Sequence, residues 1–121
     1  MYTRDTINGN LLLTVEPEIT DSPDNVTLVE GNDAVFTCVA TARPRPSITW
    51  WVVQDGGTPT MITSDAMKYN ITEMESGERV LNSTLTVFNT IPADAGTYIC
   101  MANNPTNIPA MAQAQLTVLG M

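Results

Sequence analysis

Short runs in which apolar and polar residues alternate dominate this chain, and a helical period is hard to find anywhere. The runs are rich in Val, Ile, Thr and aromatic residues, and turn-forming stretches such as EGND, ARPRP and QDGGTP separate them. The pattern predicts extended segments at residues 25–29, 33–40, 47–53, 60–63, 67–72, 80–87, 97–103 and 112–119. Short strands at this spacing predict an all-β sandwich, and 121 residues suffice for one such domain.

The chain has two cysteines, Cys38 and Cys100, which lie far apart and form no CxxC pair. This spacing argues against a zinc site or a thioredoxin-like redox motif, because both need clustered thiols or ligands. A pair that spans half the chain predicts one long-range disulfide and therefore an oxidising compartment. The alternative is two buried free thiols in an intracellular domain.

The core can be predicted from the alternation once the two cysteines point inward, as a disulfide between two sheets requires. Trp50 joins the same inward set from its own strand. The remaining inward positions are Ala34, Phe36, Ala40, Ile48, Val52, Leu81, Leu85, Val87, Tyr98, Ala102, Ala114, Leu116 and Val118.

The most specific motif is DAGTYIC at residues 94–100, together with the cysteine and tryptophan upstream of it. These residues resemble the Cys…Trp…DxGxYxC signature of immunoglobulin domains, over about residues 17–120, and the matching positions are Cys38, Trp50, Asp94, Gly96, Tyr98 and Cys100. The stretch ARPRPSITW is also similar to the start of strand C in the I-set class. The resemblance implies a Greek-key sandwich of two antiparallel sheets, ABED and A′GFCC′.

The resemblance also implies structural roles for the motif residues. Trp50 is expected to pack on the disulfide, and the Tyr98 hydroxyl to reach upstream backbone in a tyrosine corner. Gly96 is expected to serve the tight turn into strand F. The Asp94 carboxylate is expected to pair with a basic side chain, for which Lys68 is the first candidate and Arg79 the second.

Residues 1–16 depart from a simple domain. The string LLTVE at residues 12–16 is similar to QLTVL at residues 115–119, which is the expected closing strand. We therefore interpret the first sixteen residues as the tail of a preceding domain and residues 17–120 as the immunoglobulin-like domain. On this interpretation residues 11–15 lack their own sheet and are disordered or lie on a neighbouring edge.

The charge balance excludes several classes of function. Five basic residues against thirteen acidic ones give a net charge of −8, which repels nucleic acid and anionic lipid. No segment is apolar for long enough to insert into a membrane. The chain has no histidine, and both thiols belong to the predicted disulfide, so we expect neither an enzyme nor a cofactor or metal site.

Three N-x-Ser/Thr sequons mark candidate glycosylation sites at Asn25, Asn70 and Asn82. The alternation directs Asn70 and Asn82 outward from the ABED sheet, and Asn25 is expected near the A edge of that sheet. Sugars at these positions would cover one sheet and leave the other bare.

The outer face of the A′GFCC′ sheet is predicted to carry an apolar cluster, which is unusual for the solvent side of an antiparallel sheet. Its members are Trp51, Val53, Met61, Ile99 and Met101, with Thr49, Gln113 and Gln115 around them. The cluster is either a partner-binding surface or a patch that flanking loops cover. Arg43 and Arg45 in the stiff BC loop either contribute to binding or serve solubility.

These observations predict an I-set-like domain of an extracellular multi-domain protein that acts as an adhesion or receptor module. Its expected partner is a protein ectodomain, either another protein or the chain itself in a weak homodimer. The alternative is a passive spacer domain in an ectodomain stalk or a muscle-type intracellular array.

Overall fold

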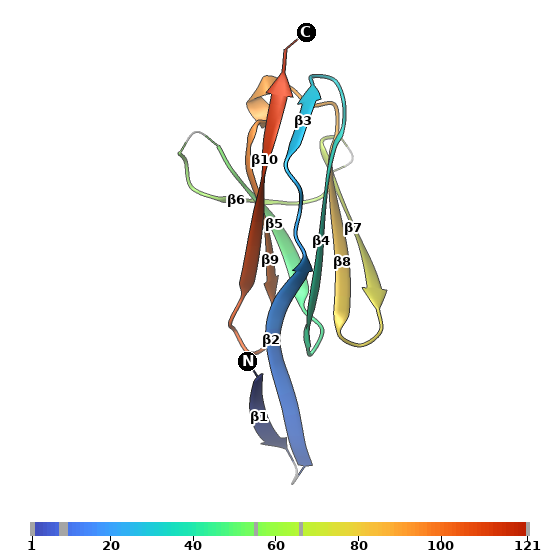
Figure 1. The fold of residues 1–121 in the computed structure, drawn as a ribbon, viewed down its shortest axis with the longest axis vertical. Helices are drawn as coiled ribbons and strands as arrows, with labels where there is room; N and C mark the ends of the chain where they lie inside the picture. The colour runs from blue at the N-terminus through green and yellow to red at the C-terminus, as the bar shows by residue number, and fades with distance from the viewer. Residues whose placement is uncertain (1, 8–9, 55, 66, 121) are drawn as a thin grey trace.

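The computed structural model describes residues 2–7, 10–54, 56–65 and 67–120, which form ten strands and one short 3-10 turn (Figure 1). The strands are β1 Tyr2–Ile7, β2 Asn10–Asp21, β3 Val26–Val29, β4 Ala34–Arg43, β5 Ser47–Val53, β6 Thr60–Ile62, β7 Tyr69–Ser76, β8 Val80–Val87, β9 Gly96–Asn103 and β10 Ala110–Leu119. The 3-10 turn η1 spans Pro92–Asp94.

The described strands form two five-stranded sheets, ordered β1-β2-β4-β8-β7 and β3-β10-β9-β5-β6. Apart from β1, these orders are the predicted ABED and A′GFCC′ sheets of an immunoglobulin-like sandwich, so the predicted fold class is confirmed. One part of the prediction is wrong, because β3 runs parallel to β10 and the second sheet is therefore mixed. The chain leaves β2 and continues in the same direction into β3, which places β3 parallel to the closing strand.

The N-terminal strands differ from the prediction. Residues 11–15 were expected to lack a sheet of their own and to be disordered or lie on a neighbouring edge, but they belong to β2, which pairs with β1 in a hairpin. The same strand continues into the sandwich and pairs with β4 from the Val15–Arg43 pair onward. The hairpin therefore extends β2 beyond the end of the sandwich that holds the β4–β5 turn (Figure 1). Whether residues 1–16 are the tail of a preceding domain stays a prediction.

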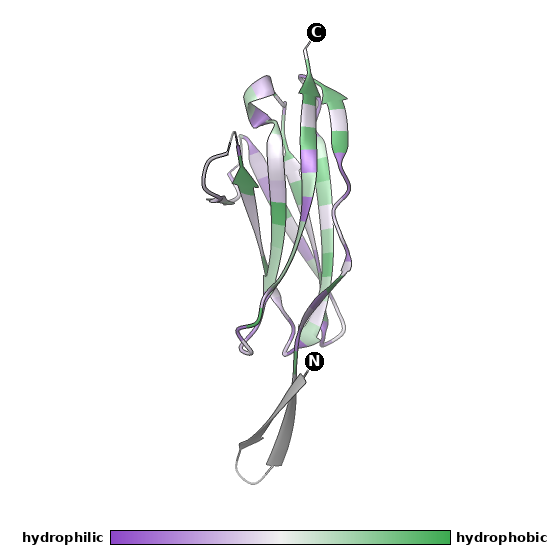
Figure 2. Cartoon of the chain, turned by 60° about the vertical axis from the view of Figure 1, so that its left-hand side comes forward, coloured by the Kyte–Doolittle hydropathy of each residue, from purple (hydrophilic) through white to green (hydrophobic). Residues whose placement is uncertain are grey.

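The predicted core is confirmed in its main members. The inward residues of β4, β5, β8, β9 and β10 are buried, with only Val52 and Val118 partly exposed. Figure 2 shows the underlying alternation of apolar and polar residues along the strands. The disulfide Cys38–Cys100 joins the two sheets across this core. Trp50 is fully buried, and its Nε1 donates a hydrogen bond of 2.9 Å to Ser83 Oγ.

The DAGTYIC stretch fixes one end of the sandwich. The Tyr98 hydroxyl donates a hydrogen bond of 2.7 Å to the Asp94 carbonyl, which is the expected tyrosine corner. Lys68 Nζ lies 2.5 Å from Asp94 Oδ2, so the first candidate for the ion pair is confirmed. At Gly96 a Cβ atom would lie 2.6 Å from the Val53 carbonyl oxygen, so close approach of β5 excludes a larger residue there.

Candidate recognition surface

The strand register arranges the outward side chains of β6, β5, β9 and β10 in rows across the second sheet. In the central row, Trp51 lies opposite Met61 on one side and Ile99 on the other, and Ile99 lies opposite Gln113. Two rows flank this one, consisting of Thr49, Met101 and Met111, and of Val53, Thr97 and Gln115. We call these ten residues the A′GFCC′ face.

The structure thus brings together every residue predicted for this sheet surface. Met61 is 49% exposed and Met111 is 66% exposed, so the described loops leave the face open at both positions. Trp51 is half-buried among its neighbours, and its Nε1 donates a hydrogen bond of 3.0 Å to Thr49 Oγ1. The indole N–H is therefore satisfied within the face, which leaves the aromatic ring as an apolar contact surface.

Sequence reasoning missed two members of the face, Thr97 and Met111. The last strand was predicted to begin at residue 112, but β10 begins at Ala110 and Met111 pairs with Met101. The signal was present, because Met111, Gln113 and Gln115 alternate with the inward alanines of the same strand.

The composition of the A′GFCC′ face differs from that of the chain as a whole. None of its ten residues is Asp, Glu, Lys or Arg, whereas the chain has eighteen charged residues and a net charge of −8. The core of a protein interface is typically depleted in charge and enriched in aromatic residues and methionine. The face has this composition.

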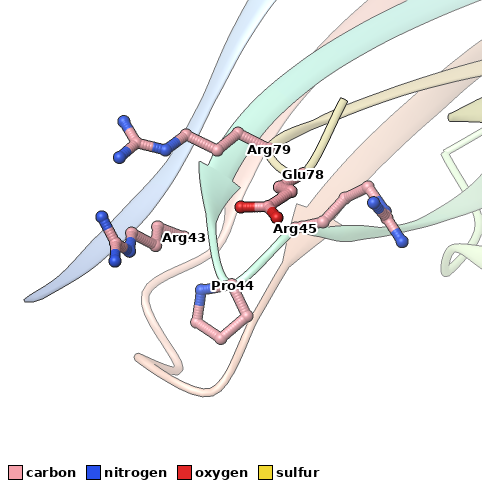
Figure 3. A pocket seen from close by; sticks show the side chains of 5 residues that line it. All are labelled: Arg43, Pro44, Arg45, Glu78 and Arg79. Atoms are coloured by element: carbon pink, nitrogen blue, oxygen red, sulfur yellow. The ribbon is translucent and has the colours of Figure 1, made fainter. Parts of the chain in front are cut away.

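Arg43 and Arg45 lie apart from the A′GFCC′ face, at the end of the sandwich beside the β7–β8 hairpin. Arg45 forms an ion pair with Glu75, and its Nη1 donates a hydrogen bond of 2.9 Å to the Gly77 carbonyl. Figure 3 shows the Arg43 and Arg79 side chains extending together in the opposite direction from Arg45. These side chains line a hollow with Pro44 and Glu78. Arg45 thus braces the turn, whereas Arg43 and Arg79 form a small basic site.

The sequons are divided between the two sheets. Asn70 on β7 is exposed, Asn82 on β8 is half-buried, and both point away from the core of their sheet, as expected. Asn25 was expected near the A edge of that sheet, and this placement is wrong. Its Oδ1 accepts a hydrogen bond of 2.9 Å from the Gln115 backbone N–H, which places it beside β10. The reason is that the chain has already crossed to the second sheet before β3.

Among the described residues, no three His, Cys, Asp or Glu side chains gather closely enough to bind a metal ion. Over the same part of the chain, no helix has the length and apolar character to cross a membrane.

The chain belongs to the immunoglobulin domain family, because the family profile described as immunoglobulin domain matches residues 16–104. It is 31% identical over 98 residues to Hemicentin-1 of Mus musculus and 32% identical over 90 residues to Matrix-remodeling-associated protein 5 of Homo sapiens. These alignments cover 79% and 74% of the chain, but only 2% and 3% of the two relatives. The chain therefore corresponds to a small part of each relative.

Solved structures show the same fold. The I-band fragment I67-I69 from titin matches with a TM-score of 0.71 and 30% identity, over 87% of this chain and 33% of the fragment. The titin Ig tandem domains A164-A165 match with a TM-score of 0.68 and 27% identity, over 87% of this chain and 48% of the tandem.

Proposed function

We propose that this domain is an extracellular recognition module that binds a protein partner through the A′GFCC′ face. The observation that carries the proposal is the face itself, in which Trp51, Ile99 and Met101 lie side by side with no charged residue among them. The solvent side of an antiparallel sheet is ordinarily polar, so an apolar face of this kind fits a surface that a partner covers.

The extracellular assignment has separate support. The disulfide favours an oxidising compartment, and one relative is named for matrix remodelling. Sequons at Asn70 and Asn82 would place sugars on the outer side of the opposite sheet, where they leave the A′GFCC′ face accessible. An I-set-like glycoprotein module of an adhesion or receptor protein fits these features.

A binding screen tests the proposal. Tetramers of the domain are applied to an array of immobilised ectodomains, and Trp51→Ala and Met101→Asp are compared with the parent chain. Loss of a central aromatic anchor typically costs about 2 kcal/mol, so each variant should bind about 30-fold more weakly. Both variants should keep the parent's circular dichroism spectrum, because the altered side chains lie outside the core.

Val35→Asp is the matched control, because Val35 is 52% exposed on β4 in the opposite sheet and should tolerate a charge without losing binding. Parent-like binding by both Trp51→Ala and Met101→Asp would show that the proposed face is wrong.

A spacer function is the second candidate. The β1–β2 hairpin and the C-terminus lie at opposite ends of the long axis, and similar titin domains occur in tandem (Figure 1). A domain that only spaces its neighbours would give no Trp51-dependent signal on the array, and that result would favour this alternative.

A further inference from the structure

We infer that the partner of the A′GFCC′ face is a second copy of this chain, joined through the same ten residues on both copies. This inference rests on the proposed function, because it names the occupant of the same surface. In such an isologous contact each residue faces the identical patch of the other copy, so the patch must be complementary to itself.

The charge distribution is the first argument. Two chains with a net charge of −8 repel each other, so a contact that brings carboxylates of the two copies together is disfavoured. The A′GFCC′ face has no charged side chain, so two copies can meet there without burying like charges. Its polar members are Thr and Gln, which both donate and accept hydrogen bonds and can therefore serve either side of a self-complementary contact.

The remaining surfaces fit a second copy less well. The outward side of the opposite sheet is also largely uncharged, but it carries the sequons at Asn70 and Asn82, where sugars would prevent close contact. The basic site of Arg43 and Arg79 could attract the acidic surface of another copy. That contact would be ionic and would weaken as salt screens it. A contact through the uncharged A′GFCC′ face would instead strengthen, because salt screens the repulsion between the two acidic copies.

The area of the face sets the expected strength. Four strands spaced about 4.8 Å apart, carrying three rows of outward residues that repeat about every 6.8 Å, give roughly 400 Å² on each copy. The total of about 800 Å² lies below the standard size of stable interfaces, in the range of weak and transient association. The dimer should therefore form in the range from about 10 μM to about 1 mM.

Sedimentation equilibrium on the whole chain, secreted from a eukaryotic host, tests the inference over that range. We expect a monomer–dimer equilibrium that tightens between about 0.1 M and about 0.5 M salt, because screening reduces the repulsion between the two acidic copies. Trp51→Ala and Met111→Asp should each weaken dimerisation by about tenfold or more. Val35→Asp on the opposite sheet and Arg43→Gln at the basic site should not weaken it.

Each other result overturns the inference in a different way. A chain that stays monomeric throughout this range has no second copy as partner, while Trp51-dependent binding to another ectodomain on the array would still support the proposed function. A dimer that Trp51→Ala and Met111→Asp leave intact uses a different surface. A dimer that weakens with salt and is lost in Arg43→Gln forms through the basic site.

Discussion

The Tyr98 side chain joins three parts of the molecule in its buried position. Its ring stacks on Phe36 with 5.0 Å between the ring centroids, and its hydroxyl bonds the Asp94 carbonyl beside the Lys68 ion pair. Burial, with smaller effects from Tyr69 and Asp94, raises the pKa of the Tyr98 phenol well above its ordinary value of 10.0. The fold therefore favours the neutral phenol over the phenolate.

The direction of this shift fixes a pH dependence. Because the folded-state pKa exceeds the unfolded value, the stabilisation is fully present below about pH 10 and declines as the pH rises beyond it. Tyr98→Phe should lower the free energy of unfolding by about 1 kcal/mol at pH 7, through loss of one hydrogen bond. Urea unfolding of both chains at rising pH should show this difference shrinking above about pH 10. A difference that stays constant to high pH would contradict the argument.

At the residue scale, the motif spacing predicted some partners and not others. Tyr98 could be assigned because its partner lies four residues upstream in the motif, and Lys68 because of the resemblance to a known family. The bond from Trp50 to Ser83, and the closeness of Gly96 to the Val53 carbonyl, depend on the distance between strands remote in sequence. Alternation gives the side of a strand on which a residue lies, but not the atom that it meets there.

At the element scale, the crossing between β2 and β3 decides which sheet a sugar on Asn25 would shield. Asn25 lies directly after this crossing, and its bond to the Gln115 backbone places it at the border of the A′GFCC′ face. Asn70 lies on β7 in the other sheet. Periodicity within a strand could not predict this division, because the crossing changes the sheet between two strands.

Removing single sequons tests this arrangement without altering either asparagine. Thr27→Ala abolishes the sequon of Asn25 but keeps the Asn25 side chain and its bond to Gln115. Thr72→Ala abolishes the sequon of Asn70 and keeps that asparagine. In glycoprotein from a eukaryotic host, Thr27→Ala should tighten dimerisation by up to about fivefold, the effect of roughly 1 kcal/mol at an interface rim. Thr72→Ala should leave sedimentation unchanged, and intact mass should verify the loss of one glycan in each variant. A larger gain in Thr72→Ala would place the contact on the other sheet.

At the scale of the whole molecule, alternation anchored on Cys38, Trp50 and Cys100 was enough to predict the main members of the core but not Ile62, and the family resemblance supplied the sheet order. The disulfide closes a loop with a sequence separation of 62, which the chain-entropy model credits with about 4 kcal/mol. The β1–β2 hairpin was not predicted, because an isolated string such as LLTVE does not indicate which strand it pairs with. Strand pairing depends on contacts that a short pattern does not contain.

The extent of the folding unit follows from where β2 first touches the sandwich. In the described structure, the pairing of β2 with β4 begins at the Val15–Arg43 pair, and the Val15 carbonyl accepts a hydrogen bond of 2.9 Å from Asn104 Nδ2. In the order of the described sheet, β1 stands at the edge and is hydrogen-bonded to β2. Further along β2, Ile19 packs against the core and pairs with Ala40. These described contacts join β2 to the sandwich at Val15 and Ile19.

Two deletions separate the hairpin from the domain. Removing residues 1–13 should change the free energy of unfolding by no more than about 0.5 kcal/mol, because the contacts of Val15 and Ile19 remain. Removing residues 1–19 should cost about 2–3 kcal/mol, because it also deletes the Ile19 side chain and the pairing with β4. Urea midpoints of both truncated chains against the full chain provide the measurement. Equal losses in the two deletions would mean that the hairpin is part of the folding unit, and the domain would then begin well before residue 17.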